Sequence, residues 1–295
     1  MLLPSLSDHR KGLLLTAIGG LALSMDIPLV RLAHGDMWSI LGMRSITTVA
    51  AALLVICLIR YAKGAWPVLV PGRHGLATGL LYGCSTLTFL LAVFNTATAN
   101  VVFIVAFNPM FGALLSWIFL KERPTASTLV TMAVMVFGVG LIVHDGLAGG
   151  HLFGDAMALL SAFILASAIT IARASRREMG FVPLIAAALP AALGFAKALP
   201  VGLAIENPAW IILNGTLLMP VAFWCLATGP RYLSAPEVGM FYLLETILAP
   251  IWIWLIFAEA PPTMTLVGGT ILVCAIMLHS LWMVRRKPAR QSLAH

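Results

Sequence analysis

The sequence predicts an all-α integral membrane protein of ten transmembrane helices, arranged as two five-helix repeats of inverted orientation. The first observation behind this prediction is composition. Of the 295 residues, 61% are hydrophobic and 10% are charged, and the mean hydropathy is +1.00. A soluble domain carries about 25% charged residues, so most of this apolar surface must face lipid or other helices. The other two observations are the alternation of basic residues and an internal repeat.

Apolar runs of about 20 residues, the length that a helix needs to cross a bilayer, recur along the whole chain. In order, spans 1 to 10 are expected at 12–32, 37–59, 73–94, 98–120, 126–144, 153–173, 182–203, 209–228, 234–257 and 264–283. Their connections are short, and Pro or Gly punctuates several of them. The run after Lys11 is too long for the apolar part of a signal peptide, so we interpret it as a retained first span.

The basic residues predict the orientation of these helices. With both termini in the cytoplasm, 15 of the 18 Lys and Arg residues fall in cytoplasmic segments or span ends. The other three lie within or at the edge of spans: Arg31, Arg44 and Lys197. The outer loops carry acids instead: Asp36, Asp145, Glu206 and Glu259. The net charge of +7 is therefore an orientation signal and an attraction to anionic lipid, with no nucleic acid expected as a partner.

The second half of the chain matches the first. Glu122 aligns with Glu259 and Pro124 with Pro261, an offset of 137 residues, and Arg31 of span 1 aligns with Arg173 of span 6. The two halves, 1–147 and 148–295, hold five spans each. Because five is odd, the second half must insert upside down relative to the first, which is the inverted-repeat architecture of secondary transporters.

The repeated motifs resemble the EamA family of the drug/metabolite transporter superfamily. The first copy runs from Asn108-Pro109 to Glu122, and the second runs from Glu245-Thr246 to Glu259. Thr246 is a departure, because Pro often follows the Glu of span 9 in the family. The resemblance implies a central cavity between the repeats and export of amino acids or similar small metabolites across a bacterial inner membrane. It implies neither enzyme activity nor a cofactor.

Two other function classes stay open at this point. One is a membrane-embedded enzyme acting on a lipid-linked substrate, and the other is a passive facilitator or channel. The seven His residues are scattered and no acids cluster in a loop, so metal chemistry is not expected. The chain has no P-loop, which argues against ATP-driven pumping. Alternating access, with protons as a candidate coupling ion, remains an expectation, and the oligomeric state is left between monomer and homodimer.

Charged side chains in a bilayer cost at least about 2.5 kcal/mol on insertion scales, so they face the bundle interior. Glu245, near the middle of span 9, is the first candidate for contact with substrate or a coupling proton. Its repeat partner, Asn108, is expected across the midplane from it. The alternative for Glu245 is a structural role, in which it bonds backbone freed by Pro250.

Aromatic and amide side chains complete the predicted substrate cavity: Tyr82, Asn214, Trp224 and Tyr242. For each aromatic residue, lipid anchoring or packing is the competing interpretation. Asp26 and Arg44 are predicted to form a gate or an ion pair. Pro28 should kink span 1 beside Asp26, and an Arg in span 2 can hold a carboxylate with two hydrogen bonds. Arg31 is the alternative partner of Asp26.

Overall fold

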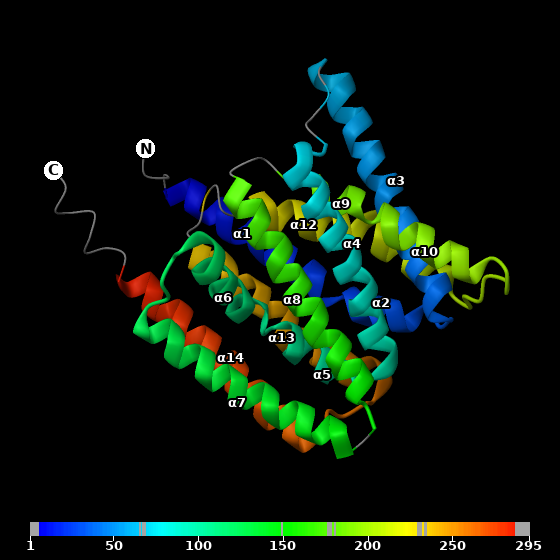
Figure 1. Cartoon of the computed structure of the whole chain (residues 1–295). Helices are drawn as coiled ribbons and strands as arrows, with labels where there is room; N and C mark the ends of the chain where they lie inside the picture. Colours follow the sequence, from blue (N-terminus) through cyan, green and yellow to red (C-terminus); the bar gives the residue numbers. More distant parts are fainter. Residues whose placement is uncertain are drawn as a thin grey trace.

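The computed structural model describes residues 6–64, 66, 69–148, 150–175, 179, 181–228, 232 and 235–286. These residues form helices joined by short connections, and one isolated bridge pairs Gly35 with Ile205. The helices run alongside one another as a bundle, and the first and last helices have their outer ends on the same side of it (Figure 1). An even number of crossings gives this arrangement.

The first half contains α1 (Leu6–Ser24), α2 (Asp26–Leu32), α3 (Met37–Lys63), α4 (Gly72–Asn95), α5 (Thr98–Val105), α6 (Asn108–Leu120) and α7 (Ala126–Ala148). The second half contains α8 (Leu152–Ser175), α9 (Val182–Ala186), α10 (Ala188–Ala198), α11 (Pro208–Leu213), the π-helix η1 (Asn214–Leu218), α12 (Met219–Thr228), α13 (Ala235–Phe257) and α14 (Thr263–Arg286). In the described part of the chain, eight helical stretches are long and apolar enough to span a membrane, and Val182–Ala198 and Leu243–Phe257 are shorter apolar helices. Together they occupy the ten predicted spans.

Four of these spans are interrupted, whereas the sequence predicted a kink in only one of them, span 1. A proline follows each interruption, and it lacks the N–H that would bond the carbonyl four residues earlier. Span 1 breaks at Met25, span 4 at Ala106–Phe107 and span 7 at Ala187, while η1 interrupts span 8. The prolines that follow are Pro28, Pro109, Pro190 and Pro220. The kink expected beside Asp26 is thus present, as the break between α1 and α2.

Each pair of packed helices has an equivalent pair, which is found by replacing each helix with its counterpart in the other repeat. The contact of α4 with α8 matches that of α12 with α1, and the contact of α6 with α8 matches that of α13 with α1. Span 2 packs on its own equivalent, span 7, through α3 and α10, and span 5 packs on span 10 through α7 and α14. A pseudo-two-fold axis relating two inverted halves produces this pattern.

Glycines allow the two self-equivalent pairs to approach closely. A Cβ on Gly194 of α10 would lie 2.4 Å from the backbone N of Gly42 in α3. A Cβ on Gly268 of α14 would lie 2.5 Å from the carbonyl oxygen of Gly138 in α7. Small residues at such crossings bring backbones into contact, which is how membrane helices associate without a hydrophobic driving force.

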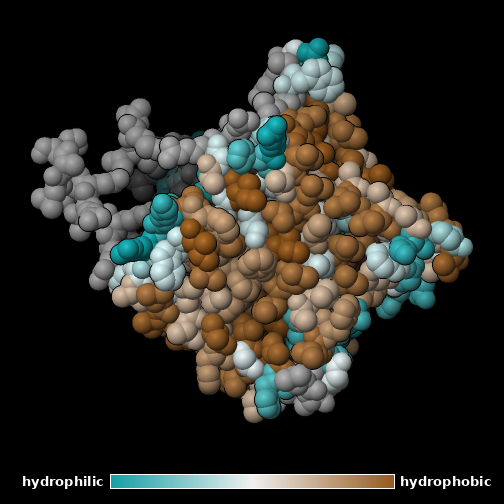
Figure 2. Space-filling model, in the orientation of Figure 1, coloured by the Kyte–Doolittle hydropathy of each residue, from teal (hydrophilic) through white to brown (hydrophobic). Residues whose placement is uncertain are grey.

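The outside of the bundle is apolar. Large side chains that face outward include Phe119, Val130, Phe137 and Leu278. Figure 2 shows apolar residues over most of the visible face, with hydrophilic residues gathered toward its ends. Soluble monomers seldom expose such extensive apolar patches. The surface therefore fits a bilayer.

Candidate functional site

The two ends of the bundle are formed by different connections. At one end, backbone hydrogen bonds join the connections that contain the acids Asp36 and Glu206: the Asp36 N–H donates to the Ala204 carbonyl at 3.0 Å, and the Glu206 N–H donates to the His34 carbonyl at 2.7 Å. We call this end the acidic face; it also holds the connections at 96–97, 150–151 and 258–262. The opposite end, with the connection at 121–125 and the end of α8, is called the basic face.

The first polar cluster inside the bundle joins spans 1, 2 and 8. Arg44 Nη2 donates to Asp26 Oδ2 at 2.6 Å, and Arg44 Nε donates to Asn214 Oδ1 at 3.1 Å. Asn214 Nδ2 donates to Asp26 Oδ1 at 2.8 Å and to the Asp26 carbonyl at 3.1 Å. All three residues are buried. Asp26 therefore pairs with Arg44, and its alternative partner, Arg31, bonds elsewhere.

Local interruptions of the helices place these three side chains. Asp26 is the first residue of α2, directly after the break at Met25, and Asn214 is the first residue of η1. A Cβ on Gly215 would lie 2.0 Å from Thr47 Oγ1 and 2.5 Å from the Arg44 carbonyl, so only glycine lets η1 approach α3 this closely. Short π-helical segments are frequent at functional sites.

Glu245 lies near the middle of α13 and faces this cluster. Asp26 and Arg44 are the charged residues that act on it electrostatically, and its side chain is half-buried. Asn108 begins α6 directly after the break in span 4 and is also half-buried. Among the described residues, neither side chain has a hydrogen-bond partner. Glu245 and Asn108 therefore stay the candidates for contact with a ligand.

The other residues predicted for the cavity occupy different positions. Tyr82 is half-buried on α4, whereas Trp224 is 61% exposed on α12. Asn214 belongs to the Asp26–Arg44 cluster. The side chain of Tyr242 lies outside the described residues, although its backbone is part of α13. The structure thus brings Asn214, Asp26, Arg44 and Glu245 together and does not bring Trp224 to them.

A second buried cluster centres on Asp155, which the sequence did not single out. Asp155 Oδ1 accepts hydrogen bonds from Thr96 Oγ1 at 2.7 Å and from Asn100 Nδ2 at 3.2 Å. Asn100 Oδ1 in turn accepts one from Thr265 Oγ1 at 2.7 Å. Asp155 is 1% exposed. In the sequence it looks like an ordinary acid in the first turn of a helix, and only the packing of spans 4, 6 and 10 shows it to be enclosed.

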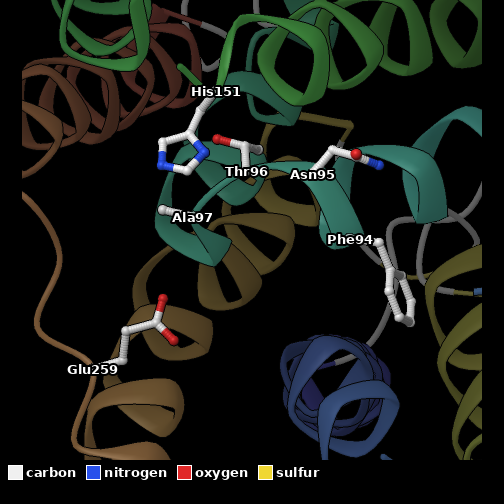
Figure 3. A pocket seen from close by; sticks show the side chains of 6 residues that line it. All are labelled: Phe94, Asn95, Thr96, Ala97, His151 and Glu259. Atoms are coloured by element: carbon white, nitrogen blue, oxygen red, sulfur yellow. The ribbon is translucent and has the colours of Figure 1, made fainter. Parts of the chain in front are cut away.

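A pocket of about 340 Å³ adjoins the Asp155 cluster at the acidic face. It is lined by Phe94, Asn95, Thr96, Ala97, His151 and Glu259. Figure 3 shows Glu259 on one side of this pocket and His151, Thr96 and Ala97 on the other. Thr96 belongs to both features, since it lines the pocket and bonds Asp155. Thr96 therefore connects the pocket at the acidic face to the buried carboxylate.

Two ion pairs, one at each face, join the two repeats. At the acidic face, Arg31 of α2 pairs with Glu259 and donates to Thr98 Oγ1 at 3.2 Å. At the basic face, Arg173 of α8 pairs with Glu122 at 2.8 Å. Because the repeat aligns Arg31 with Arg173 and Glu259 with Glu122, the two pairs are equivalent contacts. Each joins the first span of one repeat to the end of the fourth span of the other.

Within the described ranges, no group of three or more His, Cys, Asp or Glu residues could hold a metal ion. The candidate site has three parts: the Asp26–Arg44–Asn214 cluster with Glu245 beside it, the Asp155 cluster with its pocket, and the two inter-repeat ion pairs. Such an arrangement can hold a small polar molecule or ion inside an apolar bundle.

Comparison with known proteins agrees with this architecture. The family model described as the EamA-like transporter family matches the chain twice, at residues 10–144 and 152–281. A relative from Streptantibioticus cattleyicolor, named as a "Probable terminal-alkyne amino-acid exporter", is 26% identical over 253 residues, which cover 78% of this chain and 80% of the relative. A crystal structure described only as that of a protein has a TM-score of 0.65 and 16% identity, covering 94% of this chain and 99% of the other. At that identity, the likeness supports the fold alone.

Proposed function

Because this chain belongs to the EamA-like transporter family, we propose that it is a secondary transporter that exports amino acids or similar small metabolites by alternating access. The observation that carries the proposal is the equivalence of the two inter-repeat ion pairs, Arg31–Glu259 and Arg173–Glu122. A carrier with inverted repeats needs one closure at each face, and the same contact placed at both faces supplies them.

The exposure of these ion pairs suits a contact that breaks in every cycle. The side chains of Arg173 and Glu122 are 59% and 46% exposed, and those of Arg31 and Glu259 are 33% and 37% exposed. Exposed pairs contribute about 0–1 kcal/mol, so either can open without a large penalty. The buried Asp26–Arg44 pair instead holds spans 1 and 2 together throughout the cycle.

The substrate site of the proposal is the region around Glu245 and Asn108. An amino acid carries an ammonium group that can pair with the Glu245 carboxylate, and a carboxylate that can accept a hydrogen bond from the amide of Asn108. These two residues lie on spans 9 and 4, which come from different repeats. The name of the Streptantibioticus relative supports amino acids as the substrate class and export as the direction.

Counterflow in proteoliposomes tests this proposal. The purified chain is reconstituted into liposomes that contain a high concentration of one unlabelled compound, and uptake of the same compound in labelled form is measured. The measurement is repeated for a panel of amino acids, nucleosides and amines. A carrier gives uptake that an internal substrate accelerates. A channel gives uptake without this acceleration, and an enzyme without transport activity gives none, so either result would overturn the proposal.

A further inference from the structure

We propose that Asp155, Thr96, Asn100 and Thr265 form a binding site for a monovalent cation, either a proton or Na⁺, whose occupancy drives transport. The inference rests on the proposed function for its role in coupling, but cation binding itself is independent of substrate. It assigns the coupling ion to the Asp155 cluster and leaves Glu245 to the substrate.

The first observation is a carboxylate oxygen without a partner. Asp155 Oδ1 accepts two hydrogen bonds, but Oδ2 is buried and has no hydrogen-bond partner among the described residues. Burying an unpaired charge or polar atom is costly, and native proteins almost always compensate for it. The dipole of α8 favours a negative charge in its first turn, yet it gives Oδ2 no donor. A cation at Oδ2 would supply the compensation.

The second observation is the chemistry of the surrounding atoms. Thr96 Oγ1 and Asn100 Nδ2 donate to Asp155 Oδ1, and Thr265 Oγ1 donates to Asn100 Oδ1, so two hydroxyl oxygens and one amide oxygen belong to the same hydrogen-bonded network. Oxygen ligands of this kind suit hard cations. No second acid belongs to this hydrogen-bonded set, so one positive charge neutralises it. The site therefore fits a monovalent rather than a divalent cation.

No basic side chain takes this role. The charged and titratable groups nearby at the acidic face are His151 and Glu259, which line the pocket, and Arg31, which pairs with Glu259. None of the ion pairs formed by the described residues includes Asp155. Arg31 is already engaged by Glu259, Thr98 and the Phe257 ring at 4.8 Å.

The position of the cluster connects cation binding to opening of the acidic face. Thr96 and Asn100 come from the first repeat, and Asp155 and Thr265 come from the second, so a bound cation would hold the repeats together. Thr96 connects the pocket to the cluster, and the opposite wall of the pocket carries Glu259 of the Arg31–Glu259 ion pair. Gly154 keeps this packing tight, because a Cβ there would lie 2.6 Å from the Asn95 carbonyl oxygen.

Gradient-driven accumulation tests the coupling. Proteoliposomes of the wild type and Asp155→Asn are given a pH gradient in one arm and a Na⁺ gradient, with N-methyl-D-glucamine as the replacement cation, in the other. We expect one gradient to drive accumulation by the wild type. Asp155→Asn should keep exchange of substrate without a gradient and lose the gradient-driven part. Glu206→Gln, which removes an exposed acid from the same face, is the matched control and should accumulate like the wild type.

Binding is measured separately on the purified wild type, as the shift of its melting temperature when Na⁺ replaces N-methyl-D-glucamine at constant ionic strength, and when pH is varied. Should Asp155→Asn not fold, Thr265→Val should weaken the apparent cation affinity roughly tenfold, as loss of a supporting group does, while Thr265→Ser retains it. Gradient-driven accumulation by Asp155→Asn equal to the wild type would overturn the inference. So would exchange by the wild type with no response to either cation. Absence of exchange with an intact cation response would overturn the proposed function alone.

Discussion

Burial separates the ion pairs of this protein into two kinds. Asp26 and Arg44 are 4% and 7% exposed, and Asn214 satisfies both of them. Removing one partner of such a pair leaves a buried charge without compensation, whereas the exposed pairs at the two faces lose little when broken. An arginine paired with an acid therefore occurs both as a buried contact inside the bundle and as exposed contacts at its two ends.

Replacing one partner of the buried Asp26–Arg44 pair should lower the free energy of unfolding by more than its share of the loss caused by replacing both partners. Arg44→Met or Asp26→Asn alone is expected to lower the free energy of unfolding by about 3–5 kcal/mol, while the double variant should lose clearly less than the sum. Unfolding of the detergent-solubilised protein by denaturant, followed by fluorescence, gives this comparison. Additive losses would show that the two side chains do not depend on each other.

Glu245 and Asp155 are both acids within the helix bundle, half-buried and buried respectively, but we expect their neutral variants to behave differently. Glu245→Gln removes a charged contact to the substrate, and loss of such a contact costs about 1.5–3 kcal/mol, or roughly a 10–100-fold weaker apparent affinity in exchange. Asp155→Asn should leave exchange intact. Counterflow at several substrate concentrations measures both. Equal behaviour of the two variants would mean that the substrate and cation sites are not separate.

Prolines and glycines affect the helices of this bundle in different ways. Prolines break spans 1, 4 and 7 near residues of the site or its packing, and glycines set how closely spans cross. The break at Met25 turns Asp26 toward Arg44, and Gly215 brings Asn214 against the same arginine. Both effects depend on the neighbouring helix, because a freed carbonyl or a missing side chain has no consequence until something packs against it.

The crossing of spans 2 and 7 offers a direct test of packing. Gly194→Ala would place its Cβ 2.4 Å from the Gly42 nitrogen and 2.8 Å from the Trp38 carbonyl oxygen, so backbones must separate. We expect a loss of about 1–3 kcal/mol in the free energy of unfolding. Gly112→Ala is the matched control, since nothing lies within 4 Å of its Cβ, and it should be neutral or stabilising by about 0.5–1 kcal/mol. Equal losses at both positions would contradict the packing argument.

In the whole molecule, the two halves contain equivalent contacts in inverted orientation. The pairs Arg31–Glu259 and Arg173–Glu122 are one contact repeated at opposite faces. If both close the same central cavity, weakening either one shifts the population toward the conformation open at that face. A substitution in either ion pair should therefore favour opening of the cavity at the face where that pair lies.

Accessibility of a central cysteine measures that direction. Asn108→Cys is made in a chain whose four native cysteines are replaced, and its reaction with a membrane-impermeant maleimide is followed from each face. Adding Glu259→Gln should speed labelling from the acidic face, and adding Glu122→Gln should speed it from the basic face. Glu206→Gln, again at the acidic face, is the control. Faster labelling from the same face in both variants would contradict the proposed gates.

The orientation predicted from the basic residues is tested in the same cysteine-free chain. Glu206→Cys and Thr125→Cys are exposed positions at the acidic and basic faces. With both termini in the cytoplasm, Glu206→Cys should react with an impermeant maleimide in intact cells and Thr125→Cys only after permeabilisation. The reverse pattern would invert the topology and with it the side from which the Asp155 pocket opens.

The ten spans, the family and the inverted repeat could all be predicted from the amino-acid sequence, because a helix that crosses a bilayer needs a long apolar run and cytoplasmic loops carry an excess of basic residues. The sequence also pointed to Asp26, Arg44 and Glu245, since charges in lipid are rare. The packing of the helices was needed to show that Asp26 pairs with Arg44, that Trp224 is exposed and that Asp155 is enclosed. Burial and hydrogen-bond partners depend on which helices meet, and an acid at the end of a span is ordinary until spans 4 and 10 pack over it.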